Sequence, residues 1–177
     1  MAWKVKEFDA LTTTEIYGIM RLRSEVFVLE QECVYLDADG YDDQCLHLWK
    51  EVHGAVVAYT RILPAGVYYP EASIGRVVVA QSARGGDLGK ELMRRSEEIL
   101  YNTGYHGPVK LMAQSYLLKW YGSQGYIAEG DEFLEDGIPH TTMVKSTLLL
   151  PPPPQLPPLL DAASRPSKCA TRRRPPR

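Results

Sequence analysis

The sequence predicts an α/β fold, in which helices cover the faces of a mixed β-sheet. Ser73 to Val79 contains the β-branched run of a buried strand, and the apolar residues from Leu88 to Leu100 then recur at helical spacing. Three strand patterns and one helix pattern precede this unit, and further strand and helix patterns follow it. The predicted element order is therefore β-α-β-β-β-α-β-α-β-β.

The first half of the chain begins with an edge strand, because Trp3 to Phe8 alternates between apolar and polar residues. Thr12 followed by Glu15 forms a capping box, which predicts an amphipathic helix that ends before Gln31. Arg21, Arg23 and Glu25 are expected on its solvated face. His53-Gly54 then predicts a tight turn between strands at 46–52 and 55–63.

The second half continues from the strand at Ser73 through the helix that ends near Tyr101. Val109 to Ala113 reads as a strand, and Tyr116 to Gln124 as a short helix that Gly125 ends in a left-handed conformation. Strands near 126–129 and 141–145 complete the predicted sheet.

Composition divides the chain into a folded domain at 1–146 and a Pro/Arg-rich tail at 147–177. Residues 1–145 contain 14 Lys and Arg against 21 Asp and Glu, whereas residues 146–177 contain 6 against 1. Nine of the 13 prolines follow Leu150, so we expect the tail to be disordered or polyproline-like. An SH3-type ligand or a nucleic-acid arm at Arg172-Arg173-Arg174 is the alternative to an extension without a role.

Cysteine usage and hydropathy favour a soluble, cytoplasmic protein. Cys33, Cys45 and Cys169 are too few and too scattered for a disulfide scaffold or a zinc site. No stretch reaches the roughly 18 apolar residues of a membrane span, and the N-terminus lacks a signal core. We expect no metal, no membrane and no nucleic acid among the partners of this chain.

A glycine-rich turn, Arg84 to Gly89, joins the central strand to the central helix and forms a plausible anion cradle. Amides at a helix start lack intrahelical partners and lie at the positive end of the helix dipole, so they favour a phosphate. Counting excludes two nucleotide motifs: a Walker loop needs four residues between its glycines, and a dinucleotide fingerprint needs G-x-G-x-x-G.

This turn resembles the acyl-CoA loop of the Gcn5-related N-acetyltransferases (GNAT), Arg/Gln-x-x-Gly-x-Gly/Ala. Arg84 and Gly89 match its first and last positions, and Asp87 stands where the family has glycine. A second segment, Ala113 to Tyr126, is similar to the family's strand, its aromatic-Tyr pair and its Gly-Tyr. Nearly all of 1–145 is similar to the ElaA-type branch, including Ile74-Gly75-Arg76-Val77-Val78 and Asp136-Gly137-Ile138-Pro139-His140.

The resemblance implies a GNAT-like acyl-CoA N-acyltransferase fold with a splayed central strand pair. Pantetheine would lie along the first of these strands, the pyrophosphate would lie on the glycine turn, and Tyr121 would lie near the thioester sulfur. Gln114 and Arg76 would orient these groups. The cofactor-binding residues implied in this way are Val77, Val78, Val79, Arg84, Gly85, Gly86, Asp87, Leu88, Gly89, Lys90 and Gln114.

The implied activity is transfer of an acetyl group from acetyl-CoA to a primary amine, by direct attack in a ternary complex. Tyr121 would share its proton with the leaving sulfur, and a strand N–H between Val77 and Val79 would serve as the oxyanion hole. A base is needed because an alkyl amine is almost fully protonated at neutral pH. The candidates are His140 and His47, with Glu30 or Glu132 acting through water.

Two other functions stay open at this point. The chain could be a catalytically weak acyl-CoA-binding sensor or interaction module, which Asp87 and the proline tail would favour, or it could acetylate a protein N-terminus or lysine. The acidic segments 37–43 and 129–136 suggest a cationic amine acceptor. The loop at 37–43 is either a solvated turn or an acidic lip, and monomer and homodimer are both compatible with the sequence.

Overall fold

The structure is a computed structural model that describes residues 2–146. Its strands are β1 (Ala2–Glu7), β2 (Leu46–Val52), β3 (Ala55–Leu63), β4 (Ala72–Val79), β5 (Val109–Gln114), β6 (Ile127–Ala128), β7 (Phe133–Glu135) and β8 (Ile138–Lys145). Its helices are α1 (Thr13–Arg23), α2 (Leu88–Asn102) and α3 (Leu118–Gly122), and a π-helical segment, η2 (Ser24–Glu30), extends α1. The tail predicted for 147–177 lies outside the described residues.

The predicted mixed sheet with helices on its faces is confirmed, and the element order differs from the prediction by one strand. Both segments of the first hairpin join at His53 and Gly54, whose φ angles are 51° and 80°, as a two-residue turn of this kind requires. The additional strand is β7, which pairs with β8 across a similar turn at Asp136-Gly137. β7 has three residues, too few for its alternation to stand out in the sequence.

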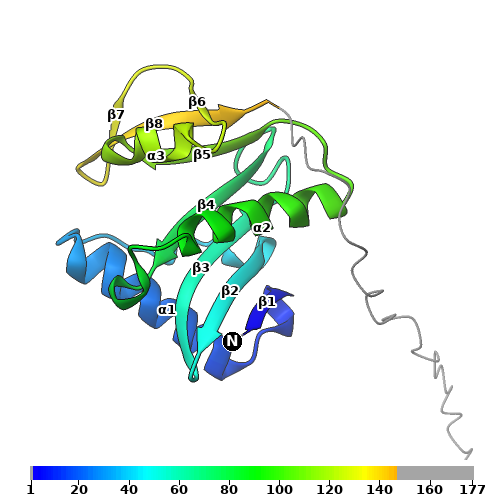
Figure 1. Ribbon diagram of the computed structural model, residues 1–177, viewed down its shortest axis with the longest axis vertical. Helices are drawn as coiled ribbons and strands as arrows, with labels where there is room; N and C mark the ends of the chain where they lie inside the picture. Colours follow the sequence, from blue (N-terminus) through cyan, green and yellow to red (C-terminus); the bar gives the residue numbers. More distant parts are fainter. Residues whose placement is uncertain (1, 147–177) are drawn as a thin grey trace, which may run out of the picture.

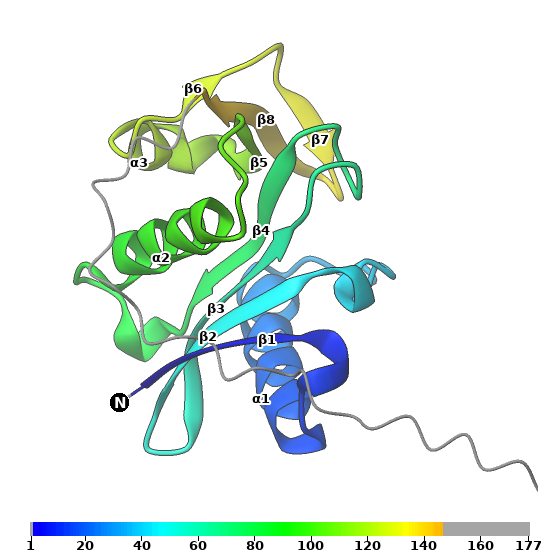
Figure 2. The same ribbon diagram turned by 90° about the vertical axis from the view of Figure 1, so that its right-hand side faces the viewer.

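A single sheet runs in the order β1-β2-β3-β4-β5-β8-β6, with β7 also paired to β8. Helices α2 and α3 lie on one face of this sheet and α1 lies on the other (Figure 2), and an apolar core fills the space on each side. The larger core joins α2 and α3 to the sheet and includes Leu92 and Met93, both fully buried. The smaller core joins α1 to Trp49, Tyr59 and Val78. The central strands are therefore covered on both sides, as their β-branched sequence predicts.

β4 and β5 part after a short contact. They are parallel neighbours, but only Ala72 pairs with Val109 and Ser73 with Lys110. Beyond these two positions the strands diverge, as Figure 1 shows, while β5 continues alongside β8 as far as Gln114. The predicted splayed pair is therefore present, and the edge of β4 that faces β5 has unpaired backbone groups from Ile74 onward.

β4 also contains one extra residue relative to its other neighbour, β3. Arg61 pairs with Gly75 and Tyr59 with Val78, so two steps along β3 correspond to three along β4. Arg76 occupies this bulge with φ = 52°, in the left-handed region. The bulge changes the alternation of β4, so that Val77 and Val79 pack toward α2 and Val78 packs toward α1.

Candidate functional site

The gap between β4 and β5 opens into a cavity of about 690 Å³. Most of the predicted cofactor-binding residues line it: Val77, Val78, Val79, Arg84, Gly85, Gly86, Gly89 and Gln114. Asp87, Leu88 and Lys90 do not line it. The two predicted catalytic residues, Tyr121 and His140, both do. The splayed strands thus bring together residues that lie more than 60 positions apart in the sequence.

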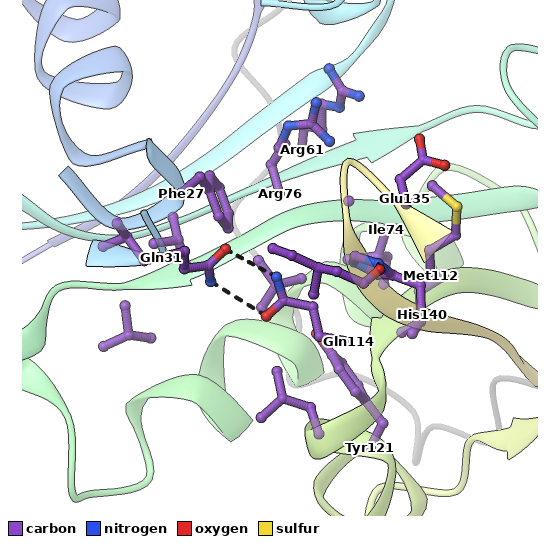
Figure 3. Close-up of a pocket in the computed structure, with 18 of the residues that line it drawn as sticks. Phe27, Gln31, Arg61, Ile74, Arg76, Met112, Gln114, Tyr121, Glu135 and His140 are labelled. Atoms are coloured by element: carbon purple, nitrogen blue, oxygen red, sulfur yellow. Dashed lines mark hydrogen bonds between the residues drawn. The ribbon is translucent and has the colours of Figure 1, made fainter. Parts of the chain in front are cut away.

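A pair of glutamines divides the cavity into two halves. Gln31 and Gln114 exchange two amide hydrogen bonds, at 3.0 and 3.3 Å, although 83 positions separate them. In Figure 3, Tyr121 lies on one side of this pair, and Arg61, Arg76 and Glu135 lie on the other. We call the part lined by Val77–Val79, Arg84–Gly86, Gly89 and Tyr121 the glycine-loop half, and the part lined by Tyr41, Tyr68, Tyr69, Arg76 and Glu135 the hairpin half.

The glycine turn forms one wall of the glycine-loop half, and at Gly85 and Gly86 this wall has no side chains. Gly85 has φ = +87°, a conformation that few residues other than glycine adopt. A Cβ atom on Gly86 would meet no protein atom within 4 Å, so the space in front of this residue is open. Gly89, in contrast, lies against Trp120, whose ring would be 3.1 Å from a Cβ atom. The turn leads directly into α2, whose first amides have no intrahelical partners.

Asp87, which departs from the family pattern, points away from the cavity. It is the N-cap residue of α2, its side chain is 90% exposed, and its carboxylate lies 3.4 Å from the Lys90 ammonium. The carboxylate makes no capping hydrogen bond. Its charge therefore faces solvent, where water and Lys90 screen it from the cavity.

Arg84 is held by protein groups in this structure. Its Nε donates to the Val79 carbonyl at 2.9 Å, and its two terminal nitrogens donate to the Glu30 carboxylate at 2.6 and 2.9 Å. Glu30 also lines the cavity, but this pairing occupies both of its oxygens. Glu132, the other predicted carboxylate base, accepts a hydrogen bond from Ser115 Oγ at 2.5 Å and does not line the cavity.

Tyr121 lies at the inner wall of the glycine-loop half, on α3. It is buried, its ring makes edge contacts with Trp120 and Tyr126, and its hydroxyl has no hydrogen-bond partner within residues 2–146. Burial raises the pKa of this phenol above its usual value. The side chain therefore stays protonated at neutral pH and has a free O–H to donate into the cavity.

The two predicted histidines are placed very differently. His140 lines the cavity beside Gln114, stacks on Phe133, and has its Nδ1 2.8 Å from the Ile138 carbonyl. A carbonyl can only accept, so Nδ1 carries the proton and Nε2 of the neutral ring keeps its lone pair. His47 does not line the cavity, and Tyr59 and the Asp42 carbonyl occupy its two nitrogens. Burial lowers the pKa of His47, which acts as a neutral core residue.

The acidic loop at 37–43 is neither of the two structures that the sequence suggested. Asp37, Asp39 and Asp42 turn inward and bind three arginines: Arg23, Arg61 and Arg76. Three positive and three negative charges make this arginine–aspartate cluster neutral overall. The loop is thus neither a solvated turn nor an acidic lip, and it forms part of the framework behind the hairpin half.

The predicted location of Arg23 was also wrong. It was expected on the solvated face of α1, but it is fully buried, and its Nε donates to Asp37 at 2.7 Å. A buried guanidinium needs paired acceptors, and the aspartates of the cluster supply them. Sequence spacing gave no sign of this, since Asp37 lies 14 positions further along the chain.

The cysteines and the acidic side chains show no further site within residues 2–146. Cys33 and Cys45 are both buried, and burial raises the pKa of the Cys45 thiol to about 12. That thiol is therefore protonated and not an activated nucleophile. In the described part of the chain, no three His, Cys, Asp or Glu side chains form a group that could hold a metal ion. None of the helices between residues 2 and 146 is long and apolar enough to cross a membrane.

Comparison with known proteins agrees with this geometry. Residues 15–147 match the family model described as "Acetyltransferase (GNAT) domain". The protein ElaA from Escherichia coli K12 is 35% identical over 150 residues, which cover 82% of this chain and 97% of ElaA. The crystal structure of an acyl-CoA N-acyltransferase from Pseudomonas aeruginosa is 38% identical, with a TM-score of 0.78 over 82% of this chain and all of that chain.

A more distant structure shares the fold alone. It is an aminoglycoside 6′-N-acetyltransferase complexed with coenzyme A, 15% identical, with a TM-score of 0.61 over 85% of this chain and 99% of that chain. Together, the splayed strands, the glycine turn and these similarities show that the chain belongs to the GNAT acetyltransferase family, in its ElaA-type branch.

Proposed function

We propose that the protein transfers an acetyl group from acetyl-CoA to a primary amine, by direct attack within a ternary complex. The observation that supports this most strongly is the gap between β4 and β5, which has the glycine turn at its edge and the free Tyr121 hydroxyl at its wall. The cavity continues past the Gln31–Gln114 pair into the hairpin half. Donor and acceptor can therefore enter from two sides and meet at the pair.

The shape and the exposed backbone of the glycine-loop half suit an acyl-CoA. The unpaired edge of β4 can form main-chain hydrogen bonds with the amides of an extended pantetheine arm, as an added strand would. The open space at Gly86 and the amides at the start of α2 suit a diphosphate. A coenzyme A complex is known for the aminoglycoside acetyltransferase of the same fold, which is consistent with this assignment.

Three groups of this chain serve the chemical step: a β4 amide, the Tyr121 hydroxyl and the His140 ring. The amine nitrogen bonds to the thioester carbonyl carbon, the carbon–sulfur bond breaks, and the amine loses a proton. A β4 amide between Val77 and Val79 donates to the carbonyl oxygen, whose negative charge grows during attack. Tyr121 donates a hydrogen bond to the leaving sulfur. Complete transfer from a phenol to a thiolate is uphill by at least about 2 kcal/mol, so Tyr121 shares its proton rather than giving it up.

His140 is the base that the geometry favours. An alkyl amine is unprotonated only about one part in a thousand at neutral pH, which costs roughly 4 kcal/mol without assistance. The lone pair on His140 Nε2 can accept the proton, directly or through a water. Of the other candidates, His47 and Glu30 are already bonded to protein groups, and Glu132 does not line the cavity.

Thiol release from acetyl-CoA, measured with a panel of amines, tests this proposal. We expect amine-dependent release that saturates in both substrates and follows sequential kinetics. An acyl-CoA-binding sensor would show a thermal shift with acetyl-CoA but no release above background, and that result would overturn the enzymatic proposal. Asp87 and the proline tail were the two sequence features in favour of a sensor, and the exposed position of Asp87 outside the cavity removes the first of them.

A further inference from the structure

We propose that the hairpin half binds an acceptor that carries a second positive charge, so that the substrate is a diamine rather than a simple alkylamine. The second ammonium would lie between the Tyr68 ring and the Glu135 carboxylate. This inference rests on the proposed function, because it names the class of amine which that reaction consumes.

Tyrosine rings form the outer wall of the hairpin half. Tyr68 makes edge contacts with Tyr41 and Tyr69, with ring centroids 5.3 and 4.9 Å apart. All three line the cavity, and Tyr68 is 39% exposed. The Lys110 ammonium already lies over Tyr69, 5.8 Å from its centroid. Since aromatic faces attract cations, a further cation can bind over the ring of Tyr68 or Tyr41 in the same wall.

The charges around this wall leave a negative excess. Arg61 and Arg76, which line the cavity, are neutralised within the arginine–aspartate cluster. Lys110 is paired with Glu71 at 3.3 Å and Glu129 at 2.9 Å. Glu135 also lines the cavity, and its carboxylate has no ion-pair or hydrogen-bond partner among residues 2–146.

Glu135 also lies within electrostatic reach of the tyrosine wall. Burial, and after it the Glu135 charge, raises the pKa of Tyr68. Strand β7 fixes the backbone of Glu135 at this edge of the cavity, since Glu135 pairs with Ile138 next to the Asp136-Gly137 turn. An aromatic face beside an unpaired carboxylate is a binding site for an ammonium ion.

The distribution of groups in the cavity explains why two amines in one molecule would fit. The reacting nitrogen must reach the thioester beside the Gln31–Gln114 pair, and His140 lies next to Gln114 on the neighbouring strand. Glu135 lies across the glutamine pair from Tyr121 (Figure 3), and the three tyrosines line the same cavity, with Tyr68 within reach of the Glu135 charge. A monoamine can occupy only one of these two positions, whereas a diamine can place one nitrogen at the reaction site and its second ammonium between Tyr68 and Glu135.

Matched acceptors of equal length test this inference. For each chain length from three to six carbons, thiol release is measured with the n-alkylamine, the α,ω-diamine and the ω-amino acid. At the best length, we expect kcat/KM for the diamine to exceed that for the alkylamine by about tenfold or more. The ω-amino acid carries a carboxylate in place of the second ammonium and should be the poorest of the three.

Glu135→Gln should remove this preference. We expect kcat/KM for the diamine to fall about tenfold through a higher KM, with the value for the alkylamine unchanged. Asp131→Asn makes the same charge change in the same region, at an exposed residue that does not line the cavity, and should change neither value. Equal thermal midpoints for the three proteins would show that folding is unaffected.

The outcomes separate the two proposals. Equal turnover of diamines and alkylamines, equal effects of Glu135→Gln on both, or a preference for the ω-amino acid would each overturn the diamine inference and leave acetyl transfer intact. A preference for the ω-amino acid would indicate that Arg76 binds the acceptor instead. No thiol release with any acceptor in any of the three proteins would overturn the proposed function itself.

Discussion

The two halves of the cavity take their walls from different kinds of structure. The glycine-loop half is mainly main chain and small residues from one contiguous stretch, 77–89, with Tyr121 added from α3. The hairpin half is made of side chains from separate segments, including Tyr41, the Tyr68-Tyr69 pair, Arg76 and Glu135. A half that uses backbone constrains few side chains and suits a donor shared by a whole family. A half built from side chains can differ from one relative to the next and so select the acceptor.

The largest effect should come from Tyr121, the side chain of the glycine-loop half to which we assign a chemical role. Tyr121→Phe keeps the buried ring and its contacts with Trp120 but removes the hydroxyl. We expect kcat to fall about 10²-fold, with acetyl-CoA binding nearly unchanged, because in the proposed mechanism the hydroxyl donates to the leaving sulfur. Steady-state kinetics and calorimetric titration of acetyl-CoA give these two quantities separately.

Tyr101→Phe is the matched control, since Tyr101 does not line the cavity. It should leave kcat unchanged. Equal kcat values for wild type and Tyr121→Phe would show that the phenol takes no part in the chemical step.

The next largest effect should be on the free energy of unfolding, through the arginine–aspartate cluster behind the hairpin half. Burial of Asp39 is outweighed by its hydrogen bonds and charge interactions with Arg61 and Arg76, which lower the pKa of this carboxyl to about 2. Its folded pKa lies below the unfolded value of about 3.9, so its stabilisation is complete above pH 4 and is lost as the pH falls toward 2. The corresponding free energy of unfolding is roughly 2 kcal/mol.

Asp39→Asn should therefore lower the free energy of unfolding at pH 7 by about 2 kcal/mol, and this difference from wild type should shrink between pH 4 and pH 2. Urea titrations across this range measure it. Asp43→Asn, at an exposed residue of the same loop, should change stability by less than about 0.5 kcal/mol. A difference at Asp39 that stays constant with pH would contradict the ion-pair account.

A smaller effect tests whether the glycine-loop half binds its ligand through exposed backbone. The Cβ atom of Gly86→Ala would meet no protein atom within 4 Å, so the fold should be unaffected. If a diphosphate lies against this backbone, the dissociation constant for acetyl-CoA should rise about tenfold.

Gly122→Ala introduces a methyl group into equally open space outside the cavity and serves as the control. It should leave the affinity for acetyl-CoA unchanged. Equal affinities for wild type and Gly86→Ala would place the diphosphate elsewhere.

The smallest effect concerns the boundary between the two halves. Gln31→Ala and Gln114→Ala each break the reciprocal amide pair, and their double mutant should be less destabilised than the sum of the two. We expect a coupling free energy of about 1 kcal/mol, typical of hydrogen-bonded partners. Additive effects, within about 0.3 kcal/mol, would show that the two residues do not act as a pair.

The same contrast explains what the sequence could predict. The strand, the glycine turn and the helix are local and leave spacing signals, and the splayed pair followed from the resemblance to the GNAT family. The fold and the glycine-loop half were therefore predictable. The ion pairs of Arg23 and Arg76 join residues 14 and 39 positions apart, and no periodicity marks such partners. The acidic loop was therefore misread, and Glu135 and Gln31 were missed as members of the site. The Asp136-Gly137 turn was the one local signal for the β7–β8 hairpin.

Hydrogen–deuterium exchange with and without acetyl-CoA tests the central claim most directly, because β4 amides beyond Ser73 lack partners on the β5 side. We predict that acetyl-CoA slows exchange in peptides covering residues 74–79 and 84–90, with little change in β1 and β2. Binding that leaves exchange in both of these segments unchanged would contradict the assignment of the gap between β4 and β5 as the acyl-CoA site.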